Sequence, residues 1–318
     1  MDHFKTIIGQ SPALDALIRS ARIAAATDVT ILLNGETGTG KEILAKAIQQ
    51  SSSRANKPFI TLNCAALPES LIESELFGHK KGSFTGATGN TQGLLQAADG
   101  GTLFLDEINS LPVSIQAKLL RFIESGECLA VGGTATYTVD VRIIAASNTD
   151  LSQQITDGTF RRDLYFRLNV VPLNLPPLGE RPDDLELLIK HFMKRFESEH
   201  GMVAPQFSSR TLNALKAYSW PGNIRELRNL CERLCILLAG KIIEPENLPL
   251  EFNMVSPNFN QSHFNLPPTG LDMDNLEASL IQQALDMAKG NRSKSARLLG
   301  LTRDTLLYRM QKHGLATH

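Results

Sequence analysis

Hydrophobic and polar positions follow different periods in successive parts of the chain. In the first half, short apolar runs at 29–33, 59–62, 102–105 and 141–145 alternate with stretches of helical period such as 42–51 and 114–123. This alternation predicts a parallel sheet with crossover helices. From about Leu173 the strand pattern ends, and helical periods follow over 183–200, 208–218 and 224–238. We expect an α/β domain over residues 1–172 and a helical subdomain over residues 173–252.

A segment without charged residues follows these parts. Residues 253–270 contain no Asp, Glu, Lys or Arg, include three prolines and have no amphipathic period, so we expect a linker there. Three helices are expected beyond it, at about 276–289, 293–299 and 303–312. Gly300 suits the left-handed residue of a tight bend, and Thr302 suits the cap of the last helix. The spacing predicts an all-α helix-turn-helix domain over residues 271–318.

Composition and charge indicate a folded protein and exclude one that binds nucleic acid through its overall charge. The 318 residues are 42% hydrophobic and 20% charged, with a net charge of −1, which is typical of a folded chain that does not coat nucleic acid through bulk charge. The stretch 289–312 differs from this average, because it has seven Lys and Arg residues and one acid. Any DNA binding is therefore expected to be local.

The sequence indicates a cytoplasmic protein. It contains no apolar run of the roughly 18 residues that a membrane span needs, and residues 1–10 lack the apolar core of a signal peptide. None of the four cysteines forms a CxxC motif. Cys231 and Cys235 have no nearby histidine pair, so we expect buried thiols rather than a zinc site.

A glycine-rich loop directly follows the first apolar run. The motif GxxxxGK at the start of a helix is typical of phosphate-binding loops, in which backbone N–H groups surround the phosphates and the lysine reaches the terminal ones. Glu42 stands where a Ser or Thr usually contacts magnesium, so metal binding must depend on other groups. The loop residues are Gly35, Glu36, Thr37, Gly38, Thr39, Gly40, Lys41 and Glu42.

A second motif ends the apolar run at 102–105. Asp106 and Glu107 follow it directly, which suits a Walker B site where Asp106 holds Mg²⁺ and Glu107 orients the attacking water. The alternative is a strand that ends in two solvated acids. The pair Asn56 and Lys57 is not followed by the aspartate expected of a guanine-binding motif. The sequence therefore favours an ATPase that uses ATP and Mg²⁺.

Several motifs in order resemble those of the AAA+ activators of sigma-54 RNA polymerase, the bacterial enhancer-binding proteins. The resemblance covers nearly the whole chain and includes Glu42. The motifs are GETGTGKE at 35–42, LNCA at 62–65, ELFGHKKGSFTGA at 75–87, GGTLFLDE at 100–107, FRRDLYFRL at 160–168 and WPGNIREL at 220–227.

The resemblance implies roles for further residues of the ATPase. Asn63 would be a switch residue that pairs with Glu107, and Asn148 would be sensor I. Arg161 and Arg167 would insert into the site of a neighbouring subunit, so that activity requires a homo-oligomer, from a dimer to a hexameric ring. Arg225 would be sensor II, and the segment with Ile8 and Gly9 would line the adenine pocket, although packing alone also explains that segment.

The resemblance also implies partners. A surface loop would contact the sigma-54 RNA polymerase holoenzyme, with Ser83 where alanine is usual; an ordinary flexible loop is the alternative. Its residues are Gly82, Ser83, Phe84, Thr85, Gly86 and Ala87.

The last three helices resemble a Fis-type domain for double-stranded enhancer DNA; the alternative is a helical hairpin that only assists oligomerisation. Its outward-facing residues are expected to be Arg303, Thr305, Tyr308, Arg309 and Lys312. Because the ATPase motifs begin close to Met1, no N-terminal sensory domain is expected, and regulation would come from a protein acting in trans.

Together these features predict a transcription activator that binds upstream DNA, forms a ring and uses ATP hydrolysis to remodel sigma-54 polymerase and open a promoter. One alternative is a related regulator that acts without sigma-54. Another is a DNA-architectural protein with an inactive ATPase.

Overall fold

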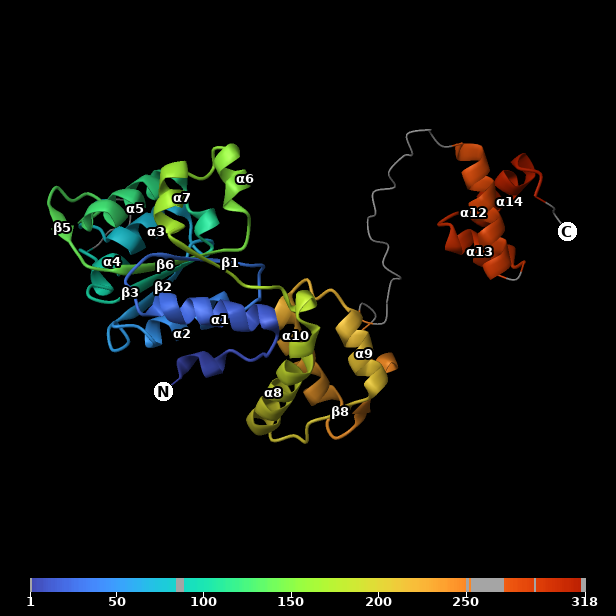
Figure 1. Ribbon diagram of the computed structural model, residues 1–318. Coiled ribbons are helices and arrows are strands. Elements are labelled where there is room, and N and C mark those ends of the chain that lie inside the picture. Colours follow the sequence, from blue (N-terminus) through green and yellow to red (C-terminus); the bar gives the residue numbers. More distant parts are fainter. Residues whose placement is uncertain (1, 84–88, 250–251, 253–271, 289, 316–318) are drawn as a thin grey trace. The chain divides into compact units, whose positions relative to one another are not determined.

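The computed structural model describes residues 2–83, 89–249, 252, 272–288 and 290–315 (Figure 1). The chain forms two compact units, residues 1–255 and 256–318. The division falls within the expected linker 253–270, which lies outside the described residues.

A five-stranded parallel sheet forms the centre of the first unit. Its strand order is β2-β3-β6-β1-β7, and all neighbouring pairs are parallel. The strands are β1 (Ile31–Asn34), β2 (Phe59–Asn63), β3 (Thr102–Asp106), β6 (Arg142–Ser147) and β7 (Val171–Asn174). The order differs from the chain order because helical crossovers connect parallel strands. The predicted parallel sheet is therefore confirmed.

Side chains alternate between the two faces of this sheet, and helices cover both. In β1, Ile31 and Leu33 join the core under α1 (Pro12–Ala25) and α2 (Lys41–Gln50). Leu32 faces the other core, which α3 (Glu69–Phe77), α5 (Val113–Ser125) and α7 (Arg162–Leu168) cover. Figure 1 shows these two helical layers on opposite sides of the sheet. Strands that are apolar on both faces result from this two-sided burial.

Shorter elements complete the α/β part. A hairpin of β4 (Glu127–Leu129) and β5 (Thr136–Thr138) follows α5. The remaining short helices are η1 (His3–Thr6), α4 (Leu94–Ala97), η2 (Ile108–Ser110) and α6 (Leu151–Thr156).

The helical lid follows η3 (Leu178–Glu180) in the same unit. It contains α8 (Pro182–His200), α9 (Ser209–Ala217) and α10 (Asn223–Leu237), with the short parallel pair β8 (Gln206–Phe207) and β9 (Ile242–Ile243), and η4 (Pro245–Asn247). Its core includes buried Phe196, Trp220 and Leu227. The strand β7 crosses the expected boundary between residues 172 and 173, so the sheet extends to Asn174. Pro172 is tolerated there because β7 is an edge strand.

The described residues of the second unit form a bundle of three helices, α12 (Met273–Met287), α13 (Arg292–Leu298) and α14 (Arg303–Lys312). Gly300 has φ +67°, and the Thr302 side chain accepts a hydrogen bond from the Thr305 N–H, so both predicted features of the bend are confirmed. The core is small, with buried Ile281, Ala296, Leu306 and Met310.

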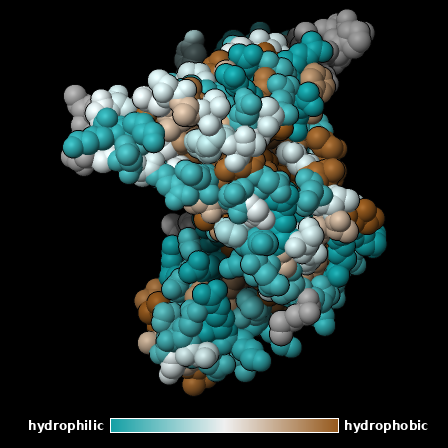
Figure 2. All heavy atoms as spheres, turned by 90° about the vertical axis from the view of Figure 1, so that its left-hand side faces the viewer, coloured by the Kyte–Doolittle hydropathy of each residue, from teal (hydrophilic) through white to brown (hydrophobic). Residues whose placement is uncertain are grey.

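Hydrophilic residues predominate on the face shown in Figure 2, where hydrophobic residues form small separate patches. Within the described ranges, no helix is both long and apolar enough to cross a membrane. All four cysteines are buried and free, which confirms that Cys231 and Cys235 are buried thiols.

Candidate nucleotide site and DNA-binding surface

The carboxyl edge of the sheet brings the predicted ATPase motifs together. The strands β3, β6 and β1 are consecutive neighbours, and they end at Asp106, Ser147 and Asn34. Because parallel strands end at the same edge, the two acids, Asn148 and the glycine-rich loop converge there. Ligands of open α/β sheets bind at this edge.

The glycine-rich loop is a tight connection whose conformation requires glycine at two positions. Gly38 has φ +82° and Gly40 has φ +103°. The Lys41 side chain is buried, and its Nζ donates to the carbonyls of Gly35 at 2.7 Å and Glu36 at 3.0 Å. Burial lowers the pKa of Lys41, while Asp106 and Glu107 oppose this shift. A phosphate that replaces the two carbonyls would restore charge pairing to this lysine.

Asp106 and Glu107 are half-buried at the end of β3. Asp106 Oδ1 accepts the Glu107 N–H at 3.0 Å, and Glu107 has the left-handed φ of +53°. A non-glycine residue in this region is strained, which is common at functional sites. Carboxylate oxygen is the ligand type that Mg²⁺ prefers, so Asp106 fits a metal at this position. Glu42 is exposed in the first turn of α2.

The two asparagines expected at the site differ in their contacts. The Asn148 Nδ2 group donates to Thr37 Oγ1 at 3.3 Å, and its buried Oδ1 has no hydrogen-bond partner among the residues that the structure describes. Asn63 ends β2 beside Asp106, but its Oδ1 accepts the Ala65 N–H at 2.8 Å. Among the described residues, no hydrogen bond joins Asn63 to Glu107, so the expected pairing is absent from this state.

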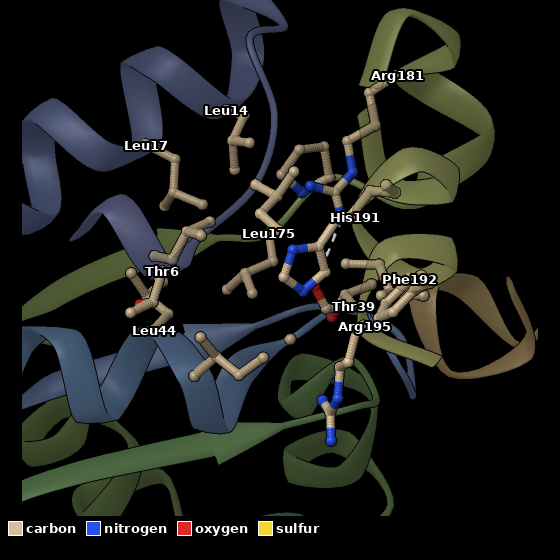
Figure 3. A pocket seen from close by; sticks show the side chains of 17 residues that line it. Thr6, Leu14, Leu17, Thr39, Leu44, Leu175, Arg181, His191, Phe192 and Arg195 are labelled. Carbon is tan, nitrogen blue, oxygen red and sulfur yellow. Dashed lines mark hydrogen bonds between the residues drawn. The ribbon is translucent and has the colours of Figure 1, made fainter. Parts of the chain in front are cut away.

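A mainly apolar pocket of about 420 Å³ lies beside the loop (Figure 3). Ile8, from the expected adenine segment, lines it together with Thr39 and Gly40. His191 and Arg195, one turn apart on α8, line another side. Partial burial lowers the pKa of His191, and Arg195 adds to the effect, so the imidazole is more easily neutral. The apolar side chains that line the pocket include Ile7, Leu14, Leu17, Leu44, Leu175, Phe192 and Ile224.

The backbone beside this pocket is fixed by a buried carboxylate. Asp184 on α8 accepts hydrogen bonds from the N–H groups of Gln10 at 2.6 Å and Ser11 at 2.8 Å. A Cβ on Gly9 would lie 2.6 Å from Asp184 Oδ2, so this glycine permits the close approach. Gly9 therefore allows the backbone beside the pocket to pack closely against Asp184. Arg181, also buried, donates to the Thr39 carbonyl at 3.4 Å.

Arg225 lies in the first turn of α10, on the lid side of the loop. It is exposed and lines a second pocket with Thr37 and Gly222. Its charge contributes to the lowered pKa of Lys41, which places the two cations close enough to interact. An anion between them would relieve this repulsion.

The two expected trans-acting arginines lie at the two ends of α7, away from these groups. Arg161 makes two hydrogen bonds to Asp163, at 3.0 and 2.7 Å, and Arg167 binds Glu124 at 3.1 Å. All four side chains are substantially exposed. Within the described part of the chain, neither arginine contacts the glycine-rich loop.

The expected sigma-54 loop is only partly described. Gly82 has φ +80°, and a Cβ on Gly132 would lie 2.7 Å from Ser83 Cβ, so the hairpin β4–β5 lies against the start of the loop. His79 forms isolated bridges with Thr91 and Val131 just before it. Residues Phe84, Thr85, Gly86 and Ala87 lie outside the described residues.

The expected DNA-contacting residues of α14 divide into two groups. Arg303 and Tyr308 are exposed, and Thr305 is half-buried beside Thr302. Arg309 instead binds Glu277, and Lys312 binds Asp274 at 2.6 Å. Both acids lie on α12, so the cations at the end of α14 also connect the two helices. The pattern on α14 alone had placed all five residues on one outward face.

Three family descriptions match successive parts of the chain. They are the sigma-54 interaction domain at residues 7–174, the AAA+ ATPase lid domain at residues 179–263, and the bacterial regulatory protein, Fis family, at residues 273–313. The chain is 44% identical over 314 residues to the regulatory protein AtoC of Escherichia coli (strain K12), which covers 97% of this chain and 68% of AtoC. The chain belongs to the sigma-54-dependent transcriptional activators.

Other members and solved structures agree with this assignment. The chain is 42% identical over 341 residues to the DNA-binding transcriptional regulator NtrC of Rhizobium meliloti (strain 1021), which covers 98% of this chain and 70% of NtrC. The crystal structure of NtrX from Brucella abortus in complex with ATP has a TM-score of 0.73 and 34% identity, covering 97% of this chain and 69% of NtrX. The α/β domain of the activator is thus an AAA+ domain with a P-loop NTPase fold.

Sequence reasoning missed three residues beside the activator's nucleotide site. Arg181 and His191 belong to the lid and line the apolar pocket only because α8 packs beside it. Asn223 lies two positions before Arg225 within the motif WPGNIREL at 220–227. The signal for Asn223 was the motif itself, whereas nothing in the local pattern distinguishes His191 from a surface histidine.

Proposed function

We propose that this activator binds DNA upstream of a promoter, assembles into a ring and uses ATP hydrolysis to remodel the sigma-54 RNA polymerase holoenzyme. The observation that carries this proposal is the convergence of the phosphate loop, Asp106, Glu107 and the lid residue Arg225 around one sheet edge. It occurs in a chain whose three family matches include sigma-54 interaction and Fis-type regions. The proposed parts are an ATPase domain, a lid, a linker over 253–270 and a DNA-binding domain.

The proposed ligand is ATP with Mg²⁺. The base would enter the apolar pocket between Ile8 and His191, and the phosphates would bind the loop from Gly35 to Lys41. Lys41 would then exchange the Gly35 and Glu36 carbonyls for phosphate oxygens. Mg²⁺, held by Asp106, would neutralise charge on the phosphates.

Hydrolysis requires a positioned water and neutralisation of developing charge. Glu107 lies next to Asp106 and is proposed to orient or deprotonate the water. Asn148 is proposed to sense the terminal phosphate, because its Nδ2 reaches Thr37 in the loop and its Oδ1 has no partner within the described ranges. Arg225 would approach the phosphates from the lid.

Arg161 and Arg167 support a ring rather than an active monomer. Each binds an exposed carboxylate of its own chain, and between them on α7 Phe166 is 60% exposed. We infer that a neighbouring subunit's site receives these arginines, in a homo-oligomer that ranges from a dimer to a hexamer. A regulatory protein acting in trans would control this assembly.

The remaining assignments concern macromolecular partners. Residues 82–87 are proposed to contact sigma-54, with Phe84 and Thr85 as the contact positions. Arg303, Thr305 and Tyr308 on α14 are proposed to contact DNA, with Arg309 and Lys312 beside them.

The test separates force transmission from ATP chemistry. Thr85→Ala and Phe84→Ala should retain ATP turnover and enhancer binding, yet fail to open a promoter with purified sigma-54 polymerase. Ser83→Ala, in the same loop, should keep or modestly improve opening. If wild type hydrolyses ATP but opens no sigma-54 promoter, or if the two variants open promoters normally, the sigma-54-independent regulator replaces this proposal.

A further inference from the structure

One buried side chain of the lid is bonded to the phosphate loop. Asn223, the first residue of α10, is fully buried. Its Nδ2 donates to Glu36 Oε2 at 2.9 Å and to the Thr37 carbonyl at 3.2 Å. The neighbouring Ile224 N–H donates to the Gly38 carbonyl at 3.0 Å. The first turn of α10 therefore contacts three consecutive residues of the loop.

The same side chain also reaches the segment that leads from the sheet into the lid. Asn223 Oδ1 accepts the Leu178 N–H at 2.7 Å, at the start of η3. One carboxamide thus uses its acceptor for the entry to the lid and its donors for the phosphate loop. Arg225 follows two residues later on the same helix.

The backbone at this contact is strained and closely packed. Asn223 has φ +51° and Trp220 has φ +56°, a region that few non-glycine residues adopt, although asparagine tolerates it better than most. A Cβ on Gly38 would lie 2.4 Å from the Gly222 carbonyl oxygen. Gly38 is therefore required by the lid as well as by the loop. Strain of this kind persists only where surrounding contacts fix it.

Nucleotide binding is expected to change the contacts of the phosphate loop. Lys41 Nζ is bonded to the Glu36 carbonyl, the same residue whose carboxylate Asn223 holds. Entry of a phosphate would draw Lys41 away from that carbonyl and bring negative charge close to the Glu36 carboxylate. Both changes act on the residue that Asn223 contacts.

We propose that Asn223 is a positioning residue that couples occupancy of the phosphate loop to the orientation of the lid, and so to the placement of Arg225. The inference rests on the proposed ATPase function. Movement of Glu36 and Thr37 passes through the carboxamide to α10, which packs against α8 within the lid. α8 carries His191 and Arg195 of the base pocket, so the base and phosphate ends of the site respond together.

The critical variant replaces the donor group of Asn223 with a charged acceptor. Asn223→Asp keeps the size of the side chain and an oxygen for the Leu178 N–H, but it places a carboxylate against the Glu36 carboxylate and the Thr37 carbonyl. Adding Glu36→Gln then supplies an amide donor opposite the introduced carboxylate and should restore the contact with donor and acceptor exchanged. Glu36→Gln alone keeps an oxygen that can accept from Asn223. Because Glu36 belongs to the phosphate loop, the kcat and ATP affinity of this single variant are the reference for the double variant.

Steady-state hydrolysis and nucleotide binding give the first readout. Asn223→Asp should lower kcat by about 10- to 100-fold, the range expected for a lost hydrogen bond to a charged group. It should weaken ATP binding less, because Lys41 and the loop glycines remain. Relative to Glu36→Gln alone, the double variant Glu36→Gln/Asn223→Asp should lose less kcat than Asn223→Asp loses relative to wild type, because the contact with residue 36 returns while the carboxylate still faces the Thr37 carbonyl. A purely structural role for Asn223 would lower the Tm and leave the ATP-dependent change in hydrogen exchange of the lid as in wild type.

Hydrogen exchange gives a readout that does not depend on hydrolysis. ATP and Mg²⁺ should increase protection of amides 224–230 in wild type, and Asn223→Asp should lose this increase while the amides at 38–44 remain protected by the ligand. Asn213→Asp, the same exchange at an exposed position of α9, is the matched control. It should behave as wild type. Sedimentation confirms that assembly is unchanged, and thermal unfolding confirms that the variants are folded.

The outcomes distinguish the inference from the proposed function. If Asn223→Asp hydrolyses ATP like wild type, or if folded Asn223→Asp keeps the ATP-dependent protection of amides 224–230, Asn223 has no coupling role. If wild type binds ATP without hydrolysing it, the ATPase proposal fails, and the protection of 224–230 still decides the role of Asn223. If wild type binds no ATP, both are overturned.

Discussion

The two units of this activator build their functional surfaces in opposite ways. In the first unit the site joins residues that are far apart in the chain: Asn148 reaches Thr37 over 111 positions, and Asn223 reaches Glu36 over 187. In the second unit all the expected DNA-contacting residues lie on α14. Its described core is one small cluster with four buried members, whereas two larger clusters cover the two faces of the sheet.

This difference predicts how each unit fails. In the ATPase unit, a substitution at the candidate nucleotide site should reduce ATP hydrolysis and leave the fold intact, because large hydrophobic cores stabilise the domain. In the second unit, a change in the small core should remove the fold and the DNA surface together. The variants below test that contrast, from the largest expected effect to the smallest.

The largest effect should follow removal of a trans-acting arginine. Arg161→Ala or Arg167→Ala should lower hydrolysis by about 10³- to 10⁵-fold, because charge on the transferring phosphoryl group is no longer neutralised. Mixing either variant with Lys41→Ala subunits should restore turnover at interfaces that combine an intact loop with intact arginines. Phosphate release at several mixing ratios measures this. Mixed rings without any recovery would contradict action across subunits.

Loss of the proposed water-orienting acid should have the next largest effect. Glu107→Ala should reduce hydrolysis by about 10²- to 10⁴-fold while ATP stays bound, since general-base catalysis contributes in that range. Asp106→Ala should instead weaken the dependence of nucleotide use on Mg²⁺. Calorimetric binding and phosphate release together separate the two. Asp15→Ala, an exposed acid on α1, serves as the control, and wild-type turnover by Glu107→Ala would refute the assignment.

The next largest effect is expected from truncation of a core side chain in the second unit. Leu306 is fully buried, so Leu306→Ala should destabilise this unit by about 2–5 kcal/mol and abolish DNA binding while ATP hydrolysis continues. Leu298→Ala is the matched control, because Leu298 is 50% exposed. Urea unfolding and DNA binding of the full chain provide the measurements. Retained DNA affinity in Leu306→Ala would show that the small core does not limit the surface.

A smaller effect is expected when Arg303 is replaced, and it concerns discrimination between DNA sequences. Arg303→Ala should cost about 1–3 kcal/mol on specific DNA and relax sequence choice, because an exposed arginine at the start of α14 can bind a base edge. Lys312→Ala should weaken binding to all sequences about equally. Equal losses on specific and random DNA for Arg303→Ala would reassign it to a phosphate contact.

The ion pairs between α12 and α14 should give the smallest effect. Hydrogen bonding with His313 and the charge of Arg309 lower the pKa of Glu277, and Lys312 lowers the pKa of Asp274. These lowered pKa values contribute stability that is present above the ordinary carboxyl range and is lost as the pH falls through the lowered values. The Tm of the second unit should therefore fall on acidification.

Because Asp274 is exposed and Glu277 is only half-buried, the change should amount to at most a few degrees, and it should be smaller in Glu277→Gln. Melting curves of the full chain between neutral pH and about pH 3 measure it. A pH dependence of equal size in Glu277→Gln would show that other groups cause it.

Local sequence patterns were sufficient to predict those parts of the candidate sites that consist of consecutive residues. The loop from Gly35 to Lys41, the acids at 106 and 107, and the bend at Gly300 and Thr302 are short motifs whose backbone geometry follows from their own residue types. The helices of the lid also matched their predicted ranges closely. The strand β7 was missed because it is short and contains Pro172, which an edge strand accepts.

The sequence by itself determined the motifs, the order of the domains and the identity of the groups that carry charge. Only the tertiary structure decided that Asn223 contacts Glu36, that His191 and Arg181 line the apolar pocket, and that Arg309 faces Glu277. The physical reason is that these contacts depend on the relative placement of packed elements, which is set by burial of whole helix faces. A single polar residue contributes little to the periodic pattern that predicts those faces, so its partner becomes evident only when the helices are packed.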